Sequence, residues 1–115
     1  MKIETREESG CQVVAIWGSA DVESSAALRE AFMHAIEGGT RGIICDLGHT
    51  DFICSDALGV LITAYLKART RGGFVRLADP QQHLKEVLST TRLDHLFDVY
   101  GNVKDAVGGC KGKPR

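Results

Sequence analysis

The amino-acid sequence predicts a single α/β domain built on a mixed sheet of four to five strands with interleaved helices. Two strand-like segments stand at the start of the chain, and helical and strand-like segments alternate after them. A length of 115 residues leaves room for one domain, and 43% hydrophobic with 25% charged residues is typical of a globular protein. We expect the domain to span residues 1–109 and residues 110–115 to form a disordered basic tail.

A hairpin and a helix are predicted in the first third of the chain. Residues 2–7 alternate weakly, residues 12–17 form a rich strand candidate, and Ser9-Gly10 supplies the turn between them. A helix is expected from Val22 and ends at Gly38-Gly39. Its core positions recur at helical spacing: Leu28, Ala31, Phe32, Ala35 and Ile36.

The middle of the chain predicts two strands around a second helix. Residues 42–47 form a short apolar run, typical of a buried central strand, and residues 48–51 are expected to form a loop. The second helix is predicted from about Asp56 to Thr70, and residues 74–77 form the next strand.

The last third predicts shorter elements. Asp79-Pro80 is typical of a helix cap and first turn, and the helix after it carries Leu84. Residues 98–100 are expected to form a last short strand and residues 102–107 a final helical turn. The order of elements completes the α/β pattern.

Charge and hydropathy exclude several function classes. The formal net charge is −1, but Lys111, Lys113 and Arg115 lie at the end of the chain, so residues 1–110 hold 11 basic and 15 acidic residues, a net charge of −4. A mildly acidic domain argues against nucleic-acid binding. No apolar run approaches the roughly 18 residues that a membrane span requires. We therefore expect a cytoplasmic protein that binds neither nucleic acid nor membrane.

The four cysteines give no metal signature. They form no Cys-x-x-Cys pair, and no histidine stands at zinc-ligand spacing from them. Cys11 and Cys45 lie in or beside strand-like segments and are expected to be buried as small hydrophobic residues. We expect no metal site and no cofactor.

Residues 52–61, Phe-Ile-Cys-Ser-Asp-Ala-Leu-Gly-Val-Leu, carry the most specific signal. This segment resembles the signature of the STAS domain (sulfate transporters and anti-sigma factor antagonists), whose usual form is Phe-Ile/Met-Asp-Ser-Ser/Thr-Gly-Leu-Gly-Val-Leu/Ile. Residues 18–21 stand where the family has Gly-Glu-Leu-Asp, residues 43–47 resemble its strand ending in Leu-Asp-Leu, and residues 68–73 its Ala-Arg-x-x-Gly-Gly turn. The resemblance covers residues 3 to about 107.

The resemblance implies a binding module of the anti-sigma factor antagonist type. In such a protein the motif serine, which matches Ser55, is phosphorylated by a partner that is both an anti-sigma factor and an ATP-dependent serine kinase. The unphosphorylated form binds this partner and frees a sigma factor, and phosphorylation ends the binding. The partner-facing residues are then expected to come from the motif and its surroundings: Asp21, Cys54, Ser55, Asp56, Ala57, Val60 and Ala64.

The electrostatics of the helix start favour a phosphate on Ser55. Because Ser55 precedes a strong helix, we expect it at the N-cap, where a phosphate meets free N–H groups and the positive end of the helix dipole. The alternative is that Ser55 is only a good N-cap. Val60 and Ala64 give the helix a second apolar face, which either covers the sheet or meets the partner. Asp21 is expected to cap the first helix, to face the partner, or both.

Three residues depart from the family motif and leave a second function open. Cys54 stands in place of the motif's Asp, Asp56 stands in place of its second Ser or Thr, and Ala57 stands in place of its Gly. Asp56 would repel a phosphate on Ser55, so the alternative is a STAS scaffold subunit of a signalling assembly or transport system that is not switched. A third and weaker alternative is an enzyme that uses the Cys54 thiol as its nucleophile and His49 as the base. We expect no catalytic residue and no enzymatic activity, and the oligomeric state stays open.

Overall fold

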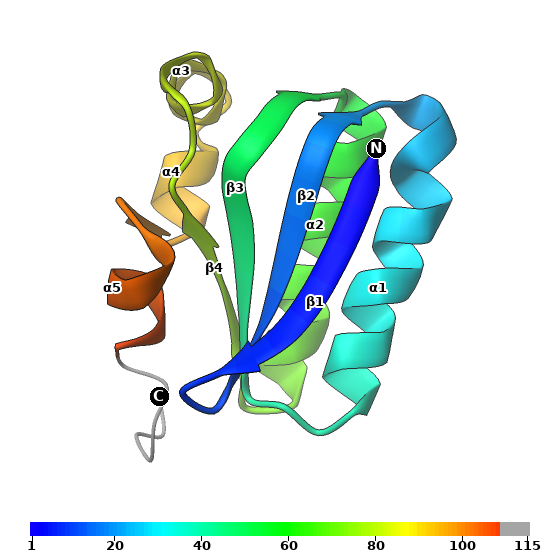
Figure 1. The fold of residues 1–115 in the computed structure, drawn as a ribbon, viewed down its shortest axis with the longest axis vertical. Helices are drawn as coiled ribbons and strands as arrows, with labels where there is room; N and C mark the ends of the chain where they lie inside the picture. Colours follow the sequence, from blue (N-terminus) through cyan, green and yellow to red (C-terminus); the bar gives the residue numbers. More distant parts are fainter. Residues whose placement is uncertain (109–115) are drawn as a thin grey trace.

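The computed structural model describes residues 1–108, whose centre is a five-stranded mixed sheet in the order β1-β2-β3-β4-β5 (Figure 1). β1 pairs with β2 in antiparallel fashion, and the three other pairs are parallel. The strands are β1 Lys2–Glu8, β2 Cys11–Ala20, β3 Gly42–Ile53, β4 Phe74–Ala78 and β5 Val99–Tyr100. The predicted fold class is confirmed. The predicted tail, residues 110–115, lies outside the described residues.

The hairpin between β1 and β2 has a two-residue loop. Glu8 pairs with Cys11, and both Ser9 (φ 52°) and Gly10 (φ 84°) adopt positive φ. A type I′ turn requires positive φ at both central positions, and its twist matches that of the flanking strands. The turn therefore sets the register of the whole β1–β2 pair.

Helices cover the two faces of the sheet unequally. The 16-residue α2 lies behind β2 and β3 in Figure 1, with α1 packed beside it, and α5 lies toward β4. The helices are the 3₁₀ turn η1 Val22–Ser24, α1 Ser25–Glu37, α2 Ser55–Thr70, α3 Gln82–Thr90, α4 Leu93–Leu96 and α5 Val103–Val107. None of those in the described part of the chain is long and apolar enough to cross a bilayer.

The larger core lies between the sheet and the helices α1 to α3. Fully buried Leu28 and Phe32 of α1 and Leu61 of α2 meet inward-facing strand residues such as Ile43 and Leu77. Cys45 lies among them, as the sequence predicted, and burial together with the nearby Asp46 carboxylate raises the pKa of its thiol far above the ordinary range.

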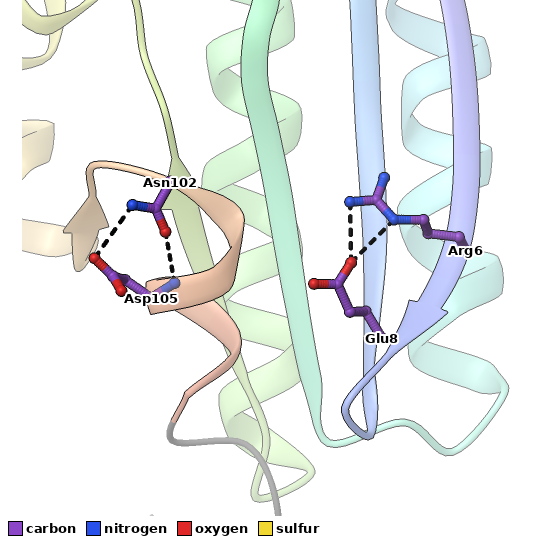
Figure 2. A network of polar contacts seen from close by, with 4 residues as sticks. All are labelled: Arg6, Glu8, Asn102 and Asp105. Carbon is purple, nitrogen blue, oxygen red and sulfur yellow. Dashed lines mark hydrogen bonds and ion pairs between the residues drawn. The ribbon is translucent and has the colours of Figure 1, made fainter.

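The smaller core lies on the other face, where Ala106 and Val107 of α5 pack on the amino-end half of the strands. Arg76, only 2% exposed, donates from Nη1 to the Ala106 carbonyl over 2.8 Å, and its guanidinium stacks 4.0 Å from the centre of the Phe74 ring. Asn102 caps α5 by accepting from the Asp105 N–H over 2.7 Å, as Figure 2 shows. This short helix is thus held by one buried cation, one cap and a few apolar contacts.

Three local predictions were wrong. Residues 48–51 continue β3 instead of forming a loop. His49 and Thr50 pair with Trp17 and Gly18 of β2, and register irregularities on either side of these two pairs absorb the extra residues of β3. The buried Thr50 hydroxyl donates to the Ile16 carbonyl over 2.8 Å. The N-cap of α3 is Gln81, because Asp79 adopts positive φ (57°) and so lies outside the helix. Val22 begins a 3₁₀ turn rather than α1 itself.

A pair of glycine substitutions tests this packing. A methyl group at Gly73 would overlap the backbone carbonyl of Arg41, whereas one at the helical Gly59 would meet open space. We expect Gly73→Ala to lower the free energy of unfolding by about 1–3 kcal/mol and Gly59→Ala to raise it by up to about 1 kcal/mol. Urea unfolding followed by circular dichroism measures both, and equal effects in the two variants would contradict the packing at the Arg41–Gly73 contact.

Candidate functional site: the carboxyl edge of the sheet

Parallel pairing brings three strand-to-helix junctions to one edge of the sheet. β2, β3 and β4 all end there, and η1, α2 and α3 begin there. The Cys54 N–H donates to the Ala20 carbonyl over 2.9 Å, which joins the first two junctions directly. Asp21 and Ser55, 34 positions apart in sequence, therefore belong to one surface, which we call the carboxyl edge.

Asp21 caps the first junction, as the sequence predicted. Its Oδ1 accepts from the Ser24 N–H over 3.2 Å and from the Ser24 hydroxyl over 2.9 Å. The residue is half-buried, so one side of the carboxylate is fixed by these bonds while the rest stays accessible. Asp21 is thus both a structural cap and a fixed negative charge on the carboxyl edge.

The helix start differs from the predicted one by a single residue. Cys54 is the N-cap of α2: its backbone is extended (φ −79°, ψ 170°), and its Sγ accepts from the Ala57 N–H over 3.4 Å. Ser55 is the first helical residue and is exposed. The prediction of Ser55 as the N-cap was therefore wrong, because the half-buried thiol takes the capping bond and leaves the Ser55 hydroxyl facing solvent.

The amino end of α2 favours a phosphate on Ser55 electrostatically, whereas the neighbouring side chains do not. The amino end of a 16-residue helix offers unpaired N–H groups and a positive dipole. Exposed Asp56 follows directly, and residues 42–66 contain no lysine or arginine. Along this segment a phosphate on Ser55 would thus meet the helix end but no basic side chain.

Three of the predicted partner-facing side chains lie in the interior. Ala57 and Ala64 are fully buried and Val60 is 2% exposed, and all three belong to the larger core. The second apolar face of α2 therefore covers the core instead of facing a partner, because α1 packs against it. Of the motif residues, Ser55 and Asp56 are exposed and Cys54 is half-buried.

The structure also exposes apolar residues that the sequence reasoning missed. Val22, which follows Asp21 directly, is 64% exposed, and Phe52, two residues before Cys54, is 53% exposed. Trp17, 38% exposed, stacks its ring on His49 with 3.8 Å between the ring centroids and an angle of 3°. The alternation along β3 could have found Phe52, because it precedes the inward-facing Ile53. The stack places His49 on the sheet face opposite α2. His49 is therefore not positioned to act as a base for Cys54.

Two further carboxylates converge at this edge. A Cβ built on Gly48 would lie 2.6 Å from Asp79 Oδ2 and 3.2 Å from Asp46 Oδ1, and the Gly48 N–H donates to Asp46 over 3.0 Å. Within residues 1–108 no group of three or more His, Cys, Asp or Glu side chains is arranged to hold a metal ion. The carboxyl edge is therefore acidic, with exposed apolar side chains between the charges.

This combination of fold and motif has close parallels among known proteins. Residues 2–106 match the family model of the STAS domain. The chain belongs to the STAS domain family. A Thermotoga neapolitana protein named as an anti-sigma factor antagonist is 28% identical over 82 residues, 71% of this chain and 73% of the relative.

Solved STAS structures share the fold at lower sequence identity. The crystal structure of an anti-sigma factor antagonist from Mycobacterium paratuberculosis superposes with a TM-score of 0.86 at 22% identity, covering 95% of this chain and 92% of the other. The phosphorylated form of SpoIIAA, a Bacillus cell fate determinant, gives 0.68 at 17% identity, covering 85% and 90%. The architecture is thus that of the STAS fold, as the sequence predicted.

The cap at Cys54 can be strengthened. A thiol is a weak hydrogen-bond acceptor, and serine is a preferred N-cap residue. We expect Cys54→Ser to raise the free energy of unfolding by about 0.5–1 kcal/mol relative to Cys54→Ala. Thermal unfolding of both variants measures the difference, and identical stabilities would mean that a side-chain acceptor at position 54 contributes nothing to the start of α2.

The two thiols should differ in reactivity. Because burial raises the pKa of Cys45, its thiol stays protonated and shielded through the neutral and mildly alkaline range, while half-buried Cys54 is accessible at the helix start. We expect iodoacetamide to modify Cys54 in the native protein and Cys45 only after unfolding. Peptide mass spectrometry after timed labelling follows each site, and equal native rates would contradict the burial of Cys45.

Proposed function

We propose that this protein is a cytoplasmic anti-sigma factor antagonist. In this proposal it binds an anti-sigma factor that is also a serine kinase, and phosphorylation of Ser55 ends the binding and returns the sigma factor to inhibition. The proposal is supported by membership of the STAS family and by relatives named as anti-sigma factor antagonists.

One observation carries the proposal: the Ser55 hydroxyl is exposed at the first turn of α2 on the carboxyl edge. A kinase must bring the γ-phosphate of ATP to the acceptor oxygen, and a buried hydroxyl would not allow that approach. The serine at the matching motif position is thus open to a visiting protein, and Asp21 lies at the adjacent junction, tied by the Cys54–Ala20 hydrogen bond.

The phosphate would act on docking rather than on folding. It adds about 1.5–2 negative charges at the positive end of α2, where helix geometry tolerates an anion. In the kinase complex, however, the same group faces the phosphates of the spent nucleotide, and like charges in a partly desolvated interface repel each other. Binding would therefore weaken while the domain stays folded.

A specific observation favours a second function. Asp56 places a carboxylate directly after Ser55, where it would repel the incoming phosphate, and Cys54 removes the family's motif carboxylate on the other side. A STAS scaffold subunit that is never phosphorylated would tolerate both changes. The two functions differ in one measurable property, the transfer of phosphate to Ser55.

Intact-mass spectrometry distinguishes them. The purified protein is incubated with ATP and, in turn, with each anti-sigma factor kinase encoded in its own genome. The antagonist function predicts a gain of one phosphate that Ser55→Ala abolishes. Thr63→Ala, which changes an exposed hydroxyl further along α2, serves as the matched control and should be phosphorylated like the wild type. No gain with any of these kinases would contradict the switch at Ser55 and favour the scaffold function instead.

A further inference from the structure

β1 forms an open edge of the sheet. It pairs with β2 on one side, and no other strand of residues 1–108 pairs with its outer side. The exposed Thr5 lines an open groove with Met33 and Glu37 of α1, so the helix, which runs beside β1 in Figure 1, does not close this border. The unpaired backbone groups of such an edge are a template for another strand.

The register of the hairpin shows which backbone groups of β1 are unpaired. Glu8 and Cys11 flank the two-residue turn and therefore exchange hydrogen bonds, and such pairs alternate with non-bonded pairs along an antiparallel ladder. The even-numbered residues of β1 thus bond to β2, whereas the N–H and C=O groups of the odd-numbered residues point outward. The Ile16 carbonyl, opposite Ile3, follows this alternation, because it points away from β1 and accepts from the Thr50 hydroxyl of β3.

Side chains of alternating charge stand on the face of β1 that is turned away from α1. Lys2, Glu4, Arg6 and Glu8 occupy every second position, and their side chains are at least 36% exposed. Lys2 Nζ lies 3.2 Å from Glu4 Oε2. Arg6 Nη2 lies 3.1 Å from Glu8 Oε1 (Figure 2). The residues that pair with them on β2 carry no charge: Trp17, Ala15, Val13 and Cys11. Within this strand pair, the charge pattern of the edge is therefore set by β1 alone.

The alternation makes β1 complementary to a second copy of itself. An antiparallel pair of β1 strands with a two-fold axis at Thr5 places Lys2 opposite Glu8 of the second copy. The same pairing places Glu4 opposite Arg6, and the symmetry repeats both pairs. Each charge then has an opposite charge across the seam as well as along its own strand. These are the non-hydrogen-bonded positions, where side chains of neighbouring strands lie closest.

The backbone selects the same pairing. The two-fold axis at Thr5 pairs Thr5 with Thr5, Ile3 with Glu7 and Glu7 with Ile3 of the second copy. These odd-numbered residues are the ones whose N–H and C=O groups point outward, so all three pairs can exchange hydrogen bonds. Backbone and charge patterns therefore agree on one register.

Shifted registers are disfavoured by charge. The outward groups can meet again only if one strand slides by two residues or a multiple of two. A shift of two in one direction places Lys2 opposite Arg6, and in the other direction it places Glu4 opposite Glu8. Like charges directly opposite each other destabilise a strand pair. A shift of four restores opposite charges but keeps only half of the charged pairs.

From this self-complementarity we propose that β1 pairs with β1 of a second copy of the chain, so that two five-stranded sheets join into one across a two-fold axis at Thr5. Charges on an edge strand usually keep other strands away. On β1 the alternating signs admit one antiparallel register with itself. Because the seam consists of one short strand from each copy, we expect a weak and reversible dimer.

This inference goes beyond the proposed function and does not depend on it. β1 is the border strand of the sheet, whereas Ser55 follows β3 in its middle. Antiparallel pairing of the two border strands points the carboxyl edges of the two copies in opposite directions. Each copy thus keeps its own Ser55 open to another protein, and failure of the dimer would leave the proposed function untouched.

Complementary charge variants test the edge. A basic variant carries Glu4→Lys with Glu8→Lys, and an acidic variant carries Lys2→Glu with Arg6→Glu, so that β1 has one sign of charge in each. Sedimentation equilibrium of the wild type from about 10 μM to about 1 mM should show a monomer–dimer equilibrium. Each variant alone should associate at least about tenfold more weakly. An equimolar mixture of the two should form a heterodimer at least as tight as the wild-type dimer.

Two control variants separate strand pairing from net charge. Lys67→Glu with Arg69→Glu changes charge by the same amount as the acidic variant, but on exposed positions of α2. It should dimerise like the wild type and should not form the tight heterodimer with the basic variant. Thr5→Pro removes an N–H that points away from β2, so the fold should persist by circular dichroism while association is lost.

The outcomes that would overturn the proposal are specific. They are a wild type that stays monomeric over the whole range, a one-sign variant that dimerises as tightly as the wild type, and a basic variant that pairs equally well with the α2 control and with the acidic variant. Association retained in a folded Thr5→Pro variant would also overturn it, because the outward N–H at the axis would then play no part.

Discussion

Parallel pairing of β2, β3 and β4 is the constraint on which the rest of the structure depends. Because the chain passes through a helix between β2, β3 and β4, the reversals that follow these three strands all fall at the same edge. The residues after the strands meet there regardless of their separation in sequence. The Cys54–Ala20 hydrogen bond fixes two of these reversals to each other. A surface for another protein can then be assembled from short loops while the apolar strands hold it rigid.

Much of this arrangement could be predicted from the sequence, for physical reasons that differ between elements. The helical spacing of apolar residues such as Leu28 and Phe32 identifies the face of the helix that is buried. The Ser9-Gly10 turn likewise fixes the register of the hairpin. Position 48, in contrast, suggested a loop because glycine is common in loops. Pairing with β2 overrode that local signal, since a sheet can absorb an extra residue as an irregularity.

The candidate site was predictable in its position but not in its detailed shape. The motif located Ser55, yet the choice between Cys54 and Ser55 as the cap depends on backbone angles that no single-sequence pattern reports. Val60 and Ala64 could not be assigned to interior or surface until the packing of α1 against α2 was known. The exposed Phe52 and Trp17 are visible only once the strand register shows which side of the sheet each occupies.

The separation of charge between the two ends of the domain has a kinetic consequence. Most carboxylates of the carboxyl edge face no basic residue there except Lys2, whereas Arg41, Lys67, Arg69 and Arg71 outnumber Glu7, Glu8 and Glu37 toward the other end. This imbalance gives the molecule a modest electric dipole along its strands. In the field of an oppositely charged protein such a dipole turns the acidic end forward before contact, which raises the fraction of diffusional collisions that begin in a productive orientation. Encounter rates should then respond to ionic strength more strongly than the lifetime of the complex does.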